Sequence, residues 1–162
     1  MSRPLREGDV VPDFERPDQA GRVWRLSGLR GGWVVLFFYP RDFSPVCTRQ
    51  ACLLRDAMPR LTAGAATVLG ISAGDAASHR AFIERHQLPY PLLSDADGSL
   101  ARLLGVRRRL LGLVPGRETI VIDPSGRVEA VYRALADGEG HAARALEAVE
   151  RATTTGGAST ET

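Results

Sequence analysis

The sequence predicts an α/β fold, with a central mixed β-sheet that carries helices on both faces. Residues 33–39 form a continuous apolar, β-branched and aromatic run, which is typical of a strand buried on both faces of a sheet. Strand-like runs of this kind alternate with helix-like segments along most of the chain. The chain then closes on a predicted hairpin and a final helix, so the elements together indicate one sheet between two layers.

Length and composition bound the organisation of the chain. Its 162 residues fit one domain, which we place at residues 1–151. The segment 152–162, rich in Thr, Gly and Ser, has almost nothing to bury, so we expect a disordered tail there. A formal net charge of +2 is too small to indicate a nucleic-acid partner. The chain shows neither an apolar leader nor an apolar stretch long enough for a membrane, so we expect a cytoplasmic protein.

The elements that precede the central strand are expected to be short. Residues 8–16 are interpreted as an extended lead-in, and residues 23–26 as a short strand that follows a turn. The glycine-rich stretch 27–32 lacks the pattern of a phosphate-binding loop and precedes a strand instead of a helix, which argues against that function. Pro40 ends the buried strand.

The later elements follow from the same periodicities. A helix that begins near Pro45 is expected to end at Pro59 or just beyond it, because proline interrupts helical hydrogen bonding. The chain should then form a strand at 66–72, a helix at 75–86, an extended piece at 90–93, a short helix at 100–104, a hairpin of 119–123 and 128–132, and a helix at 140–151.

The histidines are not expected to take part in chemistry. On the second predicted helix, Ala77 and Phe82 should pack inward, whereas His79 and His86 are interpreted as solvated and far from the cysteines. Together with His141 they show no metal-ligand spacing relative to the two cysteines. No metal site is therefore expected.

The start of the first long helix carries a cysteine. Ser44 followed by Pro45 is typical of an N-cap and a first helical residue, which places Cys47 at the third helical position. The free N–H groups and the positive end of the helix dipole favour an anion there, so they favour the thiolate. The dipole contributes about 0.3–2 kcal/mol, against ~1.4 kcal/mol per pKa unit. We therefore expect a further cation, an arginine or histidine, to reach the sulfur from elsewhere in the chain.

The motif as a whole resembles a known family. Pro40, Ser44 and Cys47 fit the pattern P-x-x-x-[T/S]-x-x-C, and Cys52 follows five residues later. This stretch resembles the peroxidatic motif of the peroxiredoxins, in particular the Q-type branch, also called bacterioferritin comigratory proteins. The resemblance implies a thioredoxin-like fold, reduction of hydroperoxides, a monomer and no cofactor.

The resemblance extends over roughly residues 5–150 and is strongest at the cysteine motif and at residues 115–123. Two positions depart from the pattern of the branch. Ser44 stands where threonine is commoner, and Gln50 stands where glutamate is common. Serine keeps the hydroxyl group, so this departure bears only on substrate preference or rate.

The resemblance also implies a role for each residue of the site. The Cys47 sulfur would attack the terminal peroxide oxygen, and the Pro40 ring would screen it from water. The Ser44 hydroxyl would donate a hydrogen bond to the substrate. Arg117, on a later strand, would hold thiolate and substrate oxygen together, because the planar guanidinium fork can donate to two partners at once.

Helix geometry separates Cys47 from Cys52. Five helical residues give a rise of about 7.5 Å and a rotation of about 140°, which puts the two Cα atoms roughly 8–9 Å apart. A disulfide needs less than about 7 Å. Cys47 shares a face with Ala51 and Leu54, whereas Cys52 lies on a more polar side with Arg55. We therefore expect a cycle in which the Cys47 sulfenic acid forms, the helix opens locally, Cys52 forms the disulfide, and a thioredoxin-like donor reduces it.

Two other classes of function share these features. A thiol–disulfide oxidoreductase would share the fold, but the chain lacks a C-x-x-C motif. A non-enzymatic redox sensor or thioredoxin-fold interaction module would keep the cysteines yet need neither Ser44 nor Arg117. The loop 107–114, basic and then apolar, is either a solvated loop or a lip that docks the reductant or an apolar alkyl hydroperoxide.

Overall fold

The computed structural model describes residues 3–106, 108–109, 114–134 and 138–158. Its centre is a five-stranded sheet with the strand order β5-β4-β3-β8-β9. β3 pairs in parallel with β4 and β4 with β5, whereas β8 is antiparallel to both β3 and β9, so the sheet is mixed as expected. The strands are β3 (Trp33–Phe38), β4 (Ala66–Ser72), β5 (Leu92–Ser94), β8 (Glu118–Ile122) and β9 (Val128–Arg133).

The central strand β3 is buried on both faces, which confirms the prediction from its apolar run. Val35 and Phe37 contribute to a core on one side of the sheet. Leu36 and Phe38 contribute to a second core on the other side. Alternating side chains of one strand therefore supply both cores, as the two-residue period of a strand requires.

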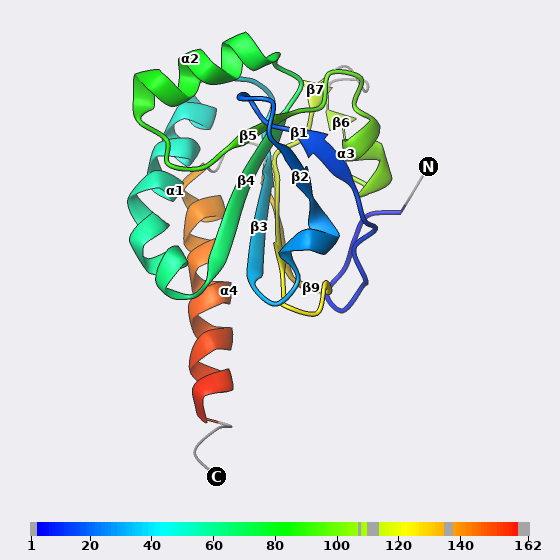
Figure 1. Cartoon of the computed structure of the whole chain (residues 1–162), viewed down its shortest axis with the longest axis vertical. Coiled ribbons are helices and arrows are strands. Elements are labelled where there is room, and N and C mark those ends of the chain that lie inside the picture. The colour runs from blue at the N-terminus through cyan, green and yellow to red at the C-terminus, as the bar shows by residue number, and fades with distance from the viewer. Residues whose placement is uncertain (1–2, 107, 110–113, 135–137, 159–162) are drawn as a thin grey trace.

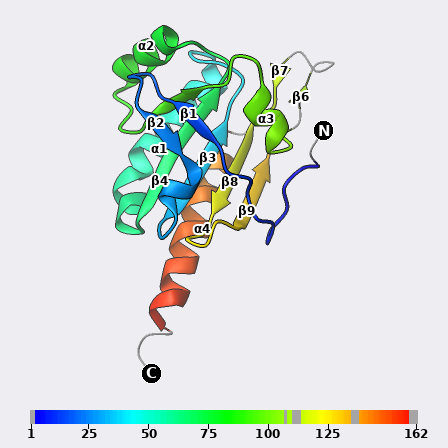
Figure 2. The same ribbon diagram turned by 45° about the vertical axis from the view of Figure 1, so that its right-hand side comes forward.

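Helices cover the two faces unequally (Figures 1 and 2). Three helices pack on the first core, and the short helix α3 packs on the second together with the N-terminal strands and a 3₁₀ helix. This arrangement confirms an α/β fold with helices on both faces of the sheet. The elements are α1 (Pro45–Ala63), α2 (Ala76–His86) and α4 (Gly138–Ala158) on the first face, and α3 (Ser99–Leu103), β1 (Glu15–Pro17), β2 (Val23–Arg25) and η1 (Leu26–Leu29) on the second.

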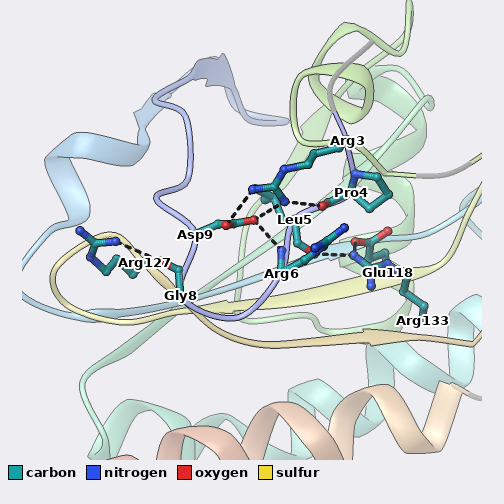
Figure 3. A network of polar contacts seen from close by, with 9 residues as sticks. All are labelled: Arg3, Pro4, Leu5, Arg6, Gly8, Asp9, Glu118, Arg127 and Arg133. Atoms are coloured by element: carbon teal, nitrogen blue, oxygen red, sulfur yellow. Dashed lines mark hydrogen bonds and ion pairs between the residues drawn. The ribbon is translucent and has the colours of Figure 1, made fainter.

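The N-terminal segment is tied to the β8–β9 hairpin by arginines (Figure 3). Arg3 forms an ion pair with Asp9 at 2.8 Å, which folds the segment back on itself. Arg133 of β9 donates to the carbonyl of Leu5 at 2.7 Å and pairs with the buried Glu118 at 3.1 Å. These contacts fix the first residue of β8.

The inward face of α2 differs from the sequence-based prediction. Phe82 is fully buried, but Ala77 is exposed and His79, which was expected in solvent, is fully buried as well. His86 is half buried, with its ring edge-on to Phe82. The reason is that His79 and Phe82 lie three residues apart and so share the helix face that meets the sheet.

The ends of the two long helices also differ from the prediction. α1 continues through Pro59 and ends at Ala63, where the Gly64 N–H bonds back to its last turn. α4 continues to Ala158, so the backbone of 152–158 is helical where a disordered tail was predicted. Elongating an existing helix adds one hydrogen bond per residue, which outweighs weak propensity. None of the helices in the described part of the chain is long and apolar enough to cross a bilayer.

The basic and apolar loop lies largely outside the described residues. Of this loop the structure describes the backbone of the short antiparallel pair β6 (Arg108–Arg109) and β7 (Val114–Pro115). The proposed lip over the active site therefore stays a prediction.

Candidate active site

The start of α1 confirms the predicted cap. Ser44 has an extended backbone (φ −69°, ψ 148°), and its Oγ accepts a hydrogen bond of 3.3 Å from the Cys47 N–H. Its carbonyl accepts from the Thr48 N–H at 2.8 Å, which closes the first helical turn. Pro45 occupies the first helical position, so Cys47 lies at the third.

The sulfur of Cys47 is buried but is bound by a cation. Cys47 is only 1% exposed and belongs to the core between α1 and the sheet. Arg117 is 5% exposed and donates from Nη2 to Sγ at 3.1 Å. A cation at this distance stabilises the thiolate inside a site from which bulk water is excluded. The structure thus places a guanidinium where the sequence required a positive charge.

Sheet pairing explains how residues 70 positions apart meet. Glu118, the first residue of β8, pairs with Phe38, the last residue of β3. Arg117 precedes it and so lies beside the point where the chain leaves β3 for α1. Since side chains alternate along a strand, Arg117 faces the same side as Thr119 and Val121, which is the side covered by α1 and α4.

Gln50 completes the arginine site, and its role was missed in the sequence. It is fully buried and lies one helical turn after Cys47. Its Oε1 accepts from Arg117 Nη1, so the guanidinium bridges the amide and the sulfur. An amide orients the guanidinium without neutralising its charge, which leaves that charge for the sulfur and substrate. The i, i+3 spacing from Cys47 is the signal that would have found this residue.

The other two predicted residues lie at the same end of the sheet. Pro40 is half buried and lies two residues after the end of β3, the strand that leads to the site. The Ser44 hydroxyl accepts the capping bond, so its own hydrogen remains available for a donor bond to another group. The N–H of Val46, at the second helical position, belongs to the first-turn groups that have no partner inside the helix. These groups form a potential site for a polar oxygen substrate.

Cys52 lies on the same helix in different surroundings. Both thiols are free, and Cys52 is half buried where Cys47 is fully buried. Beside it, the Tyr90 hydroxyl donates to the Ala51 carbonyl at 2.6 Å. Burial raises the pKa of Tyr90 well above its usual value, and the neighbouring Cys52 raises it further, so the hydroxyl keeps its proton and its bond to the helix.

A second buried cluster, also missed in the sequence, lies just before the cap. Asp42 is bonded to Tyr39, Ser78 and His79. The interpretation of His79 as solvated and remote is therefore wrong, because it contacts the loop that starts the cysteine helix. Among the described residues, no group of three or more His, Cys, Asp or Glu side chains is arranged to hold a metal ion.

Comparisons with known proteins agree with this geometry. The family model described as AhpC/TSA family matches residues 8–131. Peroxiredoxin Q, chloroplastic, from Triticum aestivum is 41% identical over 146 residues, which cover 90% of this chain and 67% of the wheat protein. The crystal structure of peroxidoxin BcpB from Mycobacterium tuberculosis is 40% identical with a TM-score of 0.84, covering 91% of this chain and 97% of that one.

A further solved structure has lower identity and the same fold. The bacterioferritin comigratory protein of Xanthomonas campestris, described with alkyl peroxide reduction activity, superimposes with a TM-score of 0.79 at 26% identity, over 94% of this chain and 99% of that one. The family model covers most of the chain, and the wheat relative exceeds 40% identity. The chain therefore belongs to the AhpC/TSA family, on its peroxiredoxin Q branch.

Proposed function

We propose that this protein is a thiol-dependent peroxidase that reduces hydrogen peroxide and organic hydroperoxides through Cys47, and that Cys52 and a thioredoxin-like reductant complete the cycle. One observation carries the proposal. The Cys47 sulfur lies at the N-terminus of α1 and accepts a 3.1 Å hydrogen bond from Arg117. Membership of the peroxiredoxin Q branch supports the same activity.

The first step is a two-electron displacement at oxygen. The Cys47 thiolate attacks the terminal oxygen, the O–O bond breaks, and the sulfur becomes a sulfenic acid while the departing alkoxide or hydroxide takes up a proton. Arg117 and the first-turn N–H groups of α1 stabilise the charge that moves onto the leaving oxygen. The Ser44 hydroxyl donates to the bound peroxide, and the Pro40 ring keeps water from the sulfur.

The second step needs a change in α1. Cys47 and Cys52 are both within the helix, with Cα atoms roughly 8–9 Å apart by helix geometry. The Cys52 thiol attacks the sulfenic sulfur, a disulfide forms and water leaves. This bond requires the first turns to unwind and Cys47 to leave Arg117. A dithiol of the thioredoxin type then reduces the disulfide by exchange and becomes oxidised itself.

Several finer features belong to the same proposal. Alkyl hydroperoxides are included because the relative from Xanthomonas campestris is described with alkyl peroxide reduction activity. We propose a monomer, by the resemblance to the Q-type branch, and no nucleic-acid or membrane partner, since the net charge of +2 is mild. A cytoplasmic location stays a prediction from the sequence.

Catalytic turnover tests the function. Purified protein is mixed with hydrogen peroxide, thioredoxin, thioredoxin reductase and NADPH, and NADPH oxidation is followed. We expect sustained turnover that depends on thioredoxin and is absent in Cys47→Ser. Oxidation of Cys47 by a single equivalent without any turnover, with several dithiol and monothiol reductants, would show a redox sensor instead of a peroxidase.

A further inference from the structure

The loop between β3 and α1 contains a buried carboxylate that the peroxidase chemistry does not use. The Asp42 side chain is 1% exposed. Tyr39 donates to its Oδ1 at 2.6 Å, and Ser78 donates to its Oδ2 at 2.7 Å. His79 Nδ1 lies 2.7 Å from the same Oδ2. Asp42 thus joins the end of β3 to the first turns of α2.

This carboxylate is held in its charged form. Burial by itself would raise the pKa of Asp42, but the hydrogen bonds from His79, Tyr39 and Ser78 outweigh burial and lower it. Burial and the neighbouring carboxylate raise the pKa of Tyr39 well above its usual value, so its hydroxyl stays a donor. A charged acceptor with several donors makes stronger hydrogen bonds than a neutral one.

The backbone at Gly74 packs closely against the side chains of Asp42 and His79. His79 is fully buried, and its Nε2 has no hydrogen-bond partner in the described part of the chain. A Cβ atom at Gly74 would lie 3.0 Å from His79 Cε1 and 3.1 Å from Asp42 Oδ2. The turn after β4 therefore fits tightly against the Asp42–His79 pair.

The residue after Asp42 adopts a strained backbone. Phe43 has φ of 66°, in the left-handed region that bulky side chains avoid. The residue is 49% exposed, and its ring packs against Phe82 (centroids 5.1 Å apart) and His86 (6.3 Å), both on α2. Such a conformation persists only where surrounding contacts hold it. Here α2 supplies contacts both to Phe43 itself and to the residue before it, Asp42.

We propose that Asp42 and His79 are positioning residues that latch the start of α1 to α2, and so set how readily Cys47 leaves Arg117 to meet Cys52. The inference rests on the proposed function. Ser44, which caps α1, follows the strained residue directly, so releasing Asp42 frees the cap and the first turn. After the first turn of α1, the Tyr90 hydroxyl donates to the Ala51 carbonyl. This hydrogen bond holds the part of the helix that follows the unwinding turns.

The latch predicts opposite effects on the two chemical steps. With the latch weakened, the wound site that reacts with peroxide is less populated, and the unwound state that forms the disulfide is more populated. Losing a hydrogen bond to a charged group corresponds to about a tenfold change in such an equilibrium. A residue that only supports the fold would lower both rates or neither.

The test measures both steps in Asp42→Asn by rapid quenching and mass spectrometry. Oxidation of Cys47 is measured in the Cys52→Ser background, and disulfide formation is measured with Cys52 present. We expect Asp42→Asn to slow oxidation and to speed disulfide formation, so that the ratio of the two rates shifts about tenfold toward disulfide formation. At high peroxide the yield of sulfinic acid should fall. Both rates unchanged, or both reduced together, would overturn the latch.

Control variants separate the latch from stability and from the proposed function. Asp95→Asn removes a buried carboxylate that accepts from Leu100 and Ala101 and caps α3 on the other face, so it should lower the melting temperature without changing either rate. Should Asp42→Asn not fold, Ser78→Ala removes a single donor to Asp42. That variant must also slow oxidation of Cys47 and speed disulfide formation. Wild-type protein in which peroxide leaves Cys47 unoxidised would refute the proposed function itself.

Discussion

The two cysteines of α1 lie five residues apart in sequence and differ in almost every physical respect. Cys47 is buried to 1% exposure at the capped end of the helix, in contact with Arg117. Cys52 is half buried on the polar side that it shares with Arg55. The intact helix therefore suits only the first chemical step of the proposed cycle. The helix places the Cys47 sulfur against Arg117 and keeps the Cys52 sulfur too far away for a disulfide. Peroxide reduction and disulfide formation therefore require two conformations of the first turns of α1.

The largest effect expected is that of Cys47→Ser. The alcohol that replaces the thiol is a far weaker nucleophile and remains protonated near Arg117, so peroxide consumption should fall to the uncatalysed rate. Consumption is measured with the thioredoxin system and also without reductant. Residual oxidation at Cys52 in this variant, at a rate near that of the wild type, would contradict the division of roles between the two cysteines.

Cys52→Ser should separate the two steps. The variant should still consume one equivalent of peroxide, because the Arg117 site is intact, but turnover with thioredoxin should be lost. Mass spectrometry should show Cys47 as sulfenic acid and then sulfinic acid as peroxide increases. Full thioredoxin-dependent turnover in this variant would remove Cys52 from the cycle.

Arg117→Lys tests whether the shape of the cation matters as well as its charge. Lysine keeps the charge, but it lacks the fork that bonds Gln50 and the Cys47 sulfur together. Removing one preorganised donor of this kind costs about 10²–10³ in rate, so we expect kcat/KM for hydrogen peroxide to fall by about 100-fold.

The matched control is Arg133→Lys. Arg133 binds Glu118 and the Leu5 carbonyl and does not contact the Cys47 sulfur. That variant keeps a positive charge beside the buried Glu118, so it should leave kcat/KM within about twofold of the wild type. Equal losses in the two variants would indicate a general effect of the hairpin on folding.

The smallest effect is expected at Ser44. Ser44→Ala loses both the cap on the Cys47 N–H and the hydroxyl that we assign to the substrate. Losing the cap should lower the free energy of unfolding by about 1 kcal/mol. Losing the donor to the substrate should lower the rate of Cys47 oxidation about tenfold relative to the wild type. Ser44→Thr keeps both functions and should restore the rate and the melting temperature. Failure of threonine to rescue the rate would leave Ser44 as a cap only.

The sequence predicted those features that depend on neighbouring residues. The buried strand, the Ser44 cap and the third helical position of Cys47 follow from local patterns, and the structure confirms them. The place of Arg117 was implied by family resemblance, because nothing in its local sequence brings it to a sulfur 70 residues away. Long-range contacts of this kind depend on sheet register, which local periodicity does not specify.

The polar partners of the site were harder to predict. Gln50 and His79 are both polar residues within helices, and each is fully buried only because another element supplies a partner. Asp42 lies within the recognised motif, but its importance depends on α2, which packs against it from elsewhere in the chain. Burial of paired polar groups is a property of the assembled fold, and single-sequence periodicity treats such residues as surface.

The most direct test of the account is a time course of both cysteines in wild-type protein after one equivalent of hydrogen peroxide. Samples are trapped with a sulfenic-acid reagent and a thiol-alkylating reagent, and the peptides are resolved by mass spectrometry. We expect a transient sulfenic acid on Cys47 alone, followed by a disulfide bond between Cys47 and Cys52 within one chain. Sulfenic acid appearing first on Cys52, or a Cys47 that stays alkylatable throughout, would contradict it.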